Sequence, residues 1–142
     1  MQEDKMAVIS ELIRTEENGT ISFGNYMLDT KSKAEDFEHD GDIYKVKTFN
    51  EITKLERNGM FVYESVPGTT ACNFAAKDAS VEFTVSGNQD AQITVQLEED
   101  MAYEVFTDGE AVGEMKTNMS GKLSLSVELA EGKKVDVKIV RK

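Results

Sequence analysis

The chain is short of the residues that carry out most enzymatic chemistry. Its 142 residues include no tryptophan, one histidine, one cysteine and one proline. A single cysteine cannot form an internal disulfide, and one histidine with one cysteine cannot supply the four ligands of a usual structural zinc site. His39 as a general base would need a nucleophile within reach, and the chain has no Gly-x-Ser-x-Gly motif. These shortages favour a protein that is not an enzyme.

Long apolar runs are also missing, and the charge is one-sided. No segment approaches the roughly 20 apolar residues that a membrane-spanning helix needs. The N-terminus has two acidic residues before any apolar stretch, so no signal peptide is predicted and we expect a cytoplasmic protein. The 27 acidic and 16 basic residues give a net charge of −11, which repels phosphate backbones and anionic lipids. We therefore expect neither nucleic acid nor a membrane as a partner.

What the second half does contain is strict alternation of apolar and polar residues. The apolar positions form five groups: Val81, Phe83 and Val85; Ile93, Val95 and Leu97; Tyr103 and Val105; Leu123, Leu125, Val127 and Leu129; Val135, Val137 and Ile139. Turn residues separate the groups: Gly87-Asn88, Asp108-Gly109, Ser120-Gly121 and Glu131-Gly132. A period of two predicts strands with one buried face. Regular turns between them predict an antiparallel β-sandwich or barrel over residues 69–142, after a type II turn at Pro67-Gly68.

The first half, residues 1–68, is predicted to be a less regular β unit. Asn58-Gly59 is the strongest hairpin signal in the chain, between two short apolar segments. Two stretches, residues 8–13 and 48–55, fit one face of a helix as well as a strand, and Thr48 to Glu51 reads as a helix capping box. We favour strands in both, because β-branched residues and Asn-Gly turns follow. The predicted fold class is all-β, with one short helix as the alternative.

The segment from Leu97 to Gly109, followed by Thr117 to Leu125, resembles the second half of bacterial immunoglobulin-like or fibronectin-type modules. In those modules a leucine precedes a corner tyrosine by six residues, as Leu97 precedes Tyr103 here. The resemblance implies an immunoglobulin-like β-sandwich for residues 69–142. It also implies that the Tyr103 hydroxyl bonds to backbone upstream of it.

The whole chain is also similar to short bacterial proteins that are called endosialidases. The matching segments are residues 7–14, 44–49, 51–59 and 63–68. This resemblance implies hydrolysis of polysialic acid, with three arginines around the substrate carboxylate and a tyrosine nucleophile paired with a glutamate. Only Arg14, Arg57 and Arg141 are available, so all three would have to converge. The aspartate-box motif, which ends in tryptophan, is absent.

Aromatic side chains offer a different function, since their flat faces pack against the C–H surfaces of sugars. The candidates for such a platform are Tyr26, Tyr44, Phe61 and Tyr63, together with Phe106. Alternation predicts that Phe61 and Tyr63 share one face of a strand, so that core packing is the competing interpretation.

An acidic run could hold a hard cation, because calcium needs several oxygens on a turning backbone. Its candidate ligands are Asp36, Glu38, Asp40 and Asp42. Asp36, Glu38 and Asp40 fit the first, third and fifth places of a calcium loop, but Lys47 stands where the closing glutamate belongs. A solvated acidic loop without a metal is the alternative, and no other cofactor is predicted.

Together these observations predict a non-enzymatic interaction or structural module of β-sandwich type. Its expected partner is a protein or a second copy of itself, because small β units expose sheet edges. Four lysines could instead protect those edges: Lys45, Lys47, Lys134 and Lys138. The alternative function is a glycan-binding accessory module, and hydrolysis of polysialic acid is the third.

Overall fold

The computed structural model describes residues 8–129 and 133–142, which form strands and no helix. The strands are β1 (Ile13–Thr15), β2 (Ile21–Phe23), β3 (Ser32–His39), β4 (Asp42–Phe49), β5 (Ile52–Arg57), β6 (Met60–Val66), β7 (Thr70–Ala76), β8 (Ser80–Ser86), β9 (Ala91–Gln96), β10 (Ala102–Thr107), β11 (Glu110–Lys116), β12 (Lys122–Val127) and β13 (Lys134–Arg141). The predicted all-β fold class is confirmed.

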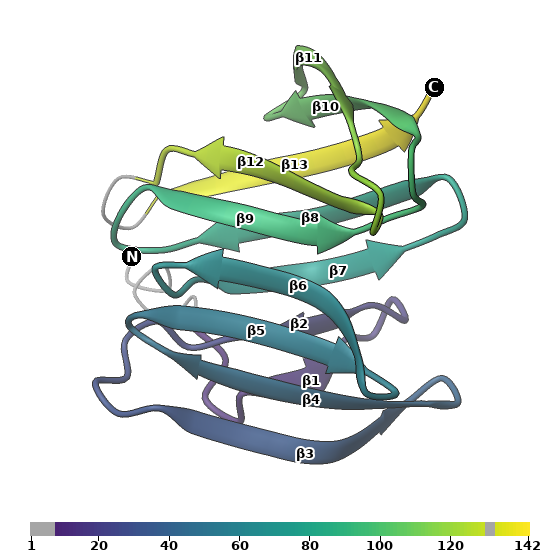
Figure 1. The fold of residues 1–142 in the computed structure, drawn as a ribbon. Helices are drawn as coiled ribbons and strands as arrows, with labels where there is room; N and C mark the ends of the chain where they lie inside the picture. Colours follow the sequence, from purple (N-terminus) through teal and green to yellow (C-terminus); the bar gives the residue numbers. More distant parts are fainter. Residues whose placement is uncertain (1–7, 130–132) are drawn as a thin grey trace.

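The strands form two antiparallel sheets that pack face to face (Figure 1). The seven-stranded sheet has the order β1-β2-β7-β8-β13-β10-β11, and the six-stranded sheet has the order β12-β9-β6-β5-β4-β3. The alternating residues predicted to be apolar and inward do point inward: β13, for example, buries Val135, Val137 and Ile139 and exposes the residues between them. The molecule is therefore a β-sandwich whose two inner faces make the core.

Both sheets contain strands from either side of residue 68. β2 pairs with β7 in one sheet, and β6 pairs with β9 in the other. The core is one continuous cluster at whose centre four rings meet: Phe23, Tyr63, Phe74 and Phe83. The Tyr63 ring lies edge-on to Phe23 at a centroid distance of 5.1 Å and to Phe83 at 5.6 Å. The two halves of the chain thus share one core.

Tight turns of two residues join three of the hairpins. Asn58 and Gly59 have φ angles of 53° and 81°, both in the left-handed region that the favoured hairpin turn requires. Asp40-Gly41 and Asp108-Gly109 have the same pair of positive angles. The hairpin predicted at Asn58-Gly59 is confirmed as the β5–β6 connection. The turn predicted at Glu131-Gly132 lies outside the described residues.

Two local predictions were wrong. The expected strand over residues 8–13 begins only at Ile13, because Leu12 has φ 75° and its N–H donates to the Ile9 carbonyl, which makes a turn. Pro67-Gly68 is not a type II turn, since Gly68 lacks the positive φ that such a turn requires.

The lysines predicted to protect sheet edges do not lie on edges. Lys45 and Lys47 belong to β4, and Lys134 and Lys138 belong to β13. Both strands have neighbours on either side, so this prediction was wrong. The sequence could not show this, because strand order depends on contacts between distant segments.

One contact implied by the immunoglobulin-like resemblance is present. The Tyr103 hydroxyl accepts a hydrogen bond from the Glu98 backbone N–H at 3.2 Å, and the Tyr103 ring is buried. This bond ties the loop after β9 to the first residues of β10, and the upstream backbone contact predicted for Tyr103 is confirmed.

Candidate binding groove on the seven-stranded sheet

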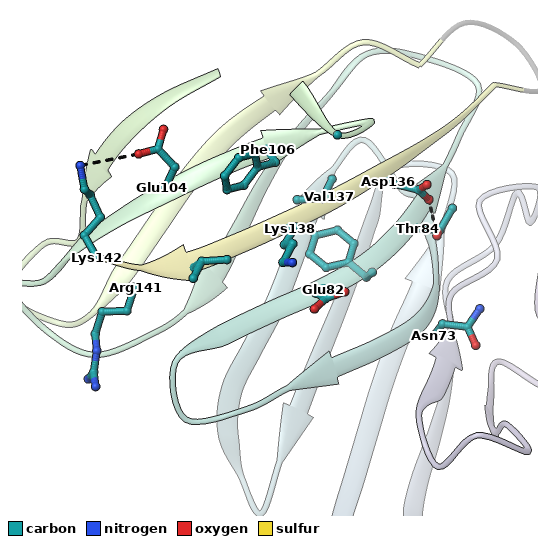
Figure 2. A pocket seen from close by; sticks show the side chains of 13 residues that line it. Asn73, Glu82, Thr84, Glu104, Phe106, Asp136, Val137, Lys138, Arg141 and Lys142 are labelled. Carbon is teal, nitrogen blue, oxygen red and sulfur yellow. Dashed lines mark hydrogen bonds and ion pairs between the residues drawn. The ribbon is translucent and has the colours of Figure 1, made fainter. Parts of the chain in front are cut away.

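A hollow with a volume of about 750 Å³ lies on the outer face of the seven-stranded sheet. Its floor is made mainly by β8, β13 and β10, as Figure 2 shows. We call this hollow the β13 groove, because β13 runs through its middle. The polar side chains that line it occupy the outward positions of these strands, whose alternate residues form the core.

Strand register arranges the groove in rows that run across three strands. Lys138 on β13 stands opposite Phe106 of β10 on one side and Glu82 of β8 on the other. We call Phe106, Lys138 and Glu82 the central row. The next row along β13 is Glu104, Val140 and Ser80. Directly opposed residues in antiparallel strands have Cβ atoms about 5 Å apart, so the side chains of each row are neighbours.

Most charged groups at the rim have partners within the protein. Arg141 donates to the Glu98 carboxylate at 2.9 Å, and the Lys142 Nζ lies 3.1 Å from Glu114 Oε1 and 3.7 Å from Glu104 Oε1. Figure 2 marks the pair of Lys142 and Glu104 with a dashed line.

The polar side chains on the floor of the groove differ in whether they have a partner within the protein. The Thr84 hydroxyl donates to Asp136 Oδ1 at 2.7 Å. Lys138, by contrast, makes no ion pair with any residue that the structure describes. The centre of the groove therefore combines a half-buried aromatic ring with an exposed lysine that stands opposite Glu82 on β8.

The aromatic residues predicted to bind sugars are mostly inside the protein. Tyr26, Tyr44 and Tyr63 are 6%, 8% and 0% exposed, so their ring faces contact protein and are not offered to a ligand. Phe61 is partly exposed on the other sheet, where the Lys122 Nζ lies 4.6 Å from the ring centroid. These four residues form no common platform. Phe106, the fifth aromatic candidate, is the one that lines the β13 groove.

The predicted calcium ligands do not gather around a common point. Asp36 sits in a bulge of β3 with φ 59°, Asp40 occupies the β3–β4 turn, and Asp42 accepts a hydrogen bond from Asn58 Nδ2 at 2.9 Å. Glu38 is exposed on β3. Within residues 8–129 and 133–142, no three His, Cys, Asp or Glu side chains lie close enough to hold a metal ion. A hairpin spreads alternate side chains along its length, whereas calcium needs six to eight oxygens that converge.

His39 has a structural role. One ring nitrogen, Nδ1, lies 3.0 Å from the Thr15 hydroxyl, and the other, Nε2, lies 3.1 Å from the Gly19 carbonyl oxygen. Because a carbonyl only accepts, Nε2 donates to Gly19, and Nδ1 shares a hydrogen bond with the Thr15 hydroxyl. Both nitrogens are used to hold β3 against the β1–β2 turn.

A second hollow, of about 430 Å³, opens near His39. It brings together several residues that the sequence analysis identified, at the turns of β3–β4 and β5–β6: His39, Asp40, Asp42, Tyr44 and Arg57. Two of these side chains already have partners: His39 donates to the Gly19 carbonyl, and Asp42 accepts from Asn58 Nδ2.

The three arginines are far apart in the fold. Arg14 on β1 binds Glu16 at 3.0 Å, while Arg141 on β13 binds Glu98. Three strands separate β1 from β13 in the same sheet, a centre-to-centre distance of about 19 Å at the usual strand spacing. Arg57 lies at the end of β5 in the other sheet. No common carboxylate site is formed by these side chains.

Cys72 is a packed thiol on β7. Burial raises its pKa above the usual value, although a hydrogen bond with Ser22 opposes this shift. A thiol with a raised pKa is a weak nucleophile at neutral pH. The part of the chain that the structure describes also contains no helix long and apolar enough to span a membrane.

Sequence reasoning identified Phe106 as a candidate but missed Lys138 and Glu82. The alternation of apolar and polar residues predicts that both side chains point outward. Every other polar residue on the surface of a strand has the same pattern, so it does not single these two out. Their proximity to Phe106 depends on β13 lying between β8 and β10, and no local pattern specifies that order. Comparison with family models, curated proteins and solved structures finds no match.

Proposed function

We propose that this protein is a non-enzymatic binding module whose ligand occupies the β13 groove. The observation that carries the proposal is the central row, in which the half-buried Phe106 ring lies beside the side chains of Lys138 and Glu82 in one hollow. A groove of this size with an apolar floor and a few polar groups is typical of ligand sites.

The chemistry of the other candidate residues supports binding over catalysis. His39 uses both ring nitrogens for structural bonds, the pKa of Cys72 is raised by burial, and the arginines lie on separate strands. A nucleophile, a base and a substrate-orienting cation would have to meet within hydrogen-bond reach for a covalent mechanism. A rigid sheet that presents side chains to a ligand requires none of these.

A ligand screen with matched variants tests the proposal. Wild-type protein, Phe106→Ala and Phe61→Ala are applied to a glycan array and to a peptide library. Phe61 is the control because it is a partly exposed aromatic residue on the opposite sheet. We expect Phe106→Ala to weaken binding of the retained ligands about tenfold, as loss of an aromatic contact in a binding site does. Phe61→Ala should bind like the wild type.

The opposite result would place the ligand elsewhere. If folded Phe106→Ala binds every retained ligand as tightly as the wild type, the β13 groove is not the binding site. If a retained ligand is cleaved during incubation, the protein is an enzyme and the non-enzymatic part of the proposal fails.

A further inference from the structure

The β12 edge of the six-stranded sheet offers a surface to a second copy of this chain, whatever ligand the β13 groove binds. We propose that β12 pairs with β12 of another copy in an antiparallel ladder, with Ser124 opposite Ser126 of the second copy. The two six-stranded sheets then form one continuous sheet. Three observations carry this inference: the free backbone groups of β12, the charges at its two ends, and a hollow beside it.

β12 is the edge strand whose backbone is most open to a further strand. It pairs with β9 at six consecutive residues without a register shift, whereas β1 has three residues and the ladders of β3 and β11 contain shifts. The N–H and carbonyl of Lys122 point away from β9 and bond to Asn118. Those of Ser124 and Ser126 point the same way, and no described residue bonds to them. These four groups are available to a second copy.

Charges of opposite sign lie at the two ends of β12. Lys122 is its first residue, and Glu128 follows its last. The Lys122 Nζ lies 4.6 Å from the centroid of the Phe61 ring, and neither Lys122 nor Glu128 makes an ion pair with a described residue. Both side chains are exposed on the outer face of the sheet, because Leu123 and Val127 beside them point into the core. Each end of the edge therefore offers a charge to a neighbouring strand.

These charges favour one register and a second copy of the same strand. With Ser124 opposite Ser126 of the second copy, Lys122 of each copy stands opposite Glu128 of the other. A shift of two residues in either direction would place Glu128 opposite Ser120 or Ser124 and leave it without a cation. Opposite charges at directly opposed positions stabilise a ladder. The edge is thus complementary to itself about a two-fold axis, as the interface of a symmetric dimer requires.

A hollow of about 580 Å³ lies beside β12, where the edges of the two sheets come together. β11 contributes Val112 and Met115 to its wall, and β12 contributes Leu125. Val112 is 52% exposed. In the proposed register the two Leu125 residues face each other at the two-fold axis, on the side of the joined sheet that borders this hollow. Pairing would therefore cover apolar surface as well as bond the free backbone groups.

Charge reversal at the two ends of β12 tests the proposal. Sedimentation equilibrium over a range of protein concentrations gives the dissociation constant of the dimer. Lys122→Glu and Glu128→Lys each turn both ion pairs of the dimer into pairs of like charge. We expect each variant to weaken the dimer about tenfold, and the variant that carries both changes to return to within about threefold of the wild type. Such a recovery would show that the single variants are weak because of charge and not because they misfold.

Lys47→Glu is the control for net charge. Lys47 is a partly exposed lysine on β4, which three strands separate from β12 in the same sheet. This variant should form dimers like the wild type. A wild-type chain that stays monomeric up to millimolar concentration overturns the proposal. A combined variant that is as weak as the single ones, or a control that is as weak as Lys122→Glu, overturns it as well.

Cysteine cross-links test the register. Opposed residues of a hydrogen-bonded pair have Cα atoms about 5.5 Å apart, which a disulfide can span. Ser124→Cys and Ser126→Cys are each made together with Cys72→Ser, which removes the single native cysteine. We expect mild oxidation to cross-link a mixture of the two variants and to leave each variant alone mostly uncross-linked. Efficient cross-linking of either variant alone would show a residue opposite its own copy, and a dimer whose mixture forms no cross-link would use another surface. Both results overturn the proposal.

Discussion

At the scale of single residues, a cluster of buried hydroxyls holds the loop between β6 and β7 against the six-stranded sheet. The Thr69 hydroxyl lies 2.7 Å from both the Tyr63 hydroxyl and Ser65 Oγ. The Thr53 hydroxyl donates to the Thr69 carbonyl at 2.8 Å and lies 2.8 Å from Thr48 Oγ1. All five residues are buried, and burial raises the pKa of Tyr63 well above its usual value. Each hydroxyl in this cluster therefore depends on the others for its hydrogen bonds.

Replacing Thr69 with valine should destabilise the protein although its shape is kept. Thr69→Val removes the partner of two buried hydroxyls, and an unsatisfied buried group costs about 1–3 kcal/mol. We expect the free energy of unfolding, measured in urea, to fall by about 2 kcal/mol. Adding Tyr63→Phe to Thr69→Val should cost much less than Tyr63→Phe alone, because the unpaired hydroxyl is then absent. Additive losses would contradict the network.

At the scale of elements, the edge strands differ in how they resist further pairing. β1 has three residues, and β3 and the β10–β11 pair contain register shifts that disturb the ladder. β12 is regular, with six consecutive pairs to β9. The Lys122 N–H and carbonyl both bond to Asn118 instead of β9. The backbone N–H and C=O groups of successive residues in a strand point to opposite sides. Those of Ser124 and Ser126 therefore point away from β9, as those of Lys122 do.

Self-association, which the sequence analysis predicted, is therefore expected to use β12. Sedimentation at two protein concentrations should show a mass above that of the monomer at the higher one. Ser124→Pro should remain folded and monomeric, because proline is tolerated on an edge where its missing N–H would face solvent. Ser124→Ala is the control and should associate like the wild type. A monomer mass for wild-type protein at both concentrations contradicts self-association.

At the scale of the whole molecule, neither half of the chain can complete its own sandwich. Residues 69–142 lack β6, the neighbour of β9, and β2, the neighbour of β7. They would also lose Tyr63, which packs against Phe74 and Phe83 at the centre of the core. Small units with incomplete cores are marginal at best.

Unfolding is therefore expected to be cooperative over both halves. The fragment 69–142 should give a poorly dispersed nuclear magnetic resonance spectrum, and the intact protein should show one transition in urea for resonances from both halves. A folded fragment, or two separate transitions, would instead support two independent domains. The isolated fragment 1–68 serves as the reciprocal control, since it lacks the same pairs of strands.

The amino-acid sequence by itself determined that the chain forms strands and which residues of β8, β9, β10, β12 and β13 lie inside. These properties are local, because a period of two and an Asn-Gly turn act over a few residues. Only the tertiary structure decided the order of strands, which puts β13 between β8 and β10 and so places Lys138 between Phe106 and Glu82. That order depends on pairing between segments far apart in the chain, where many outward residues have the same local pattern. For the same reason Tyr26, Tyr44 and Tyr63 were candidates in the sequence but lie in the core of the fold.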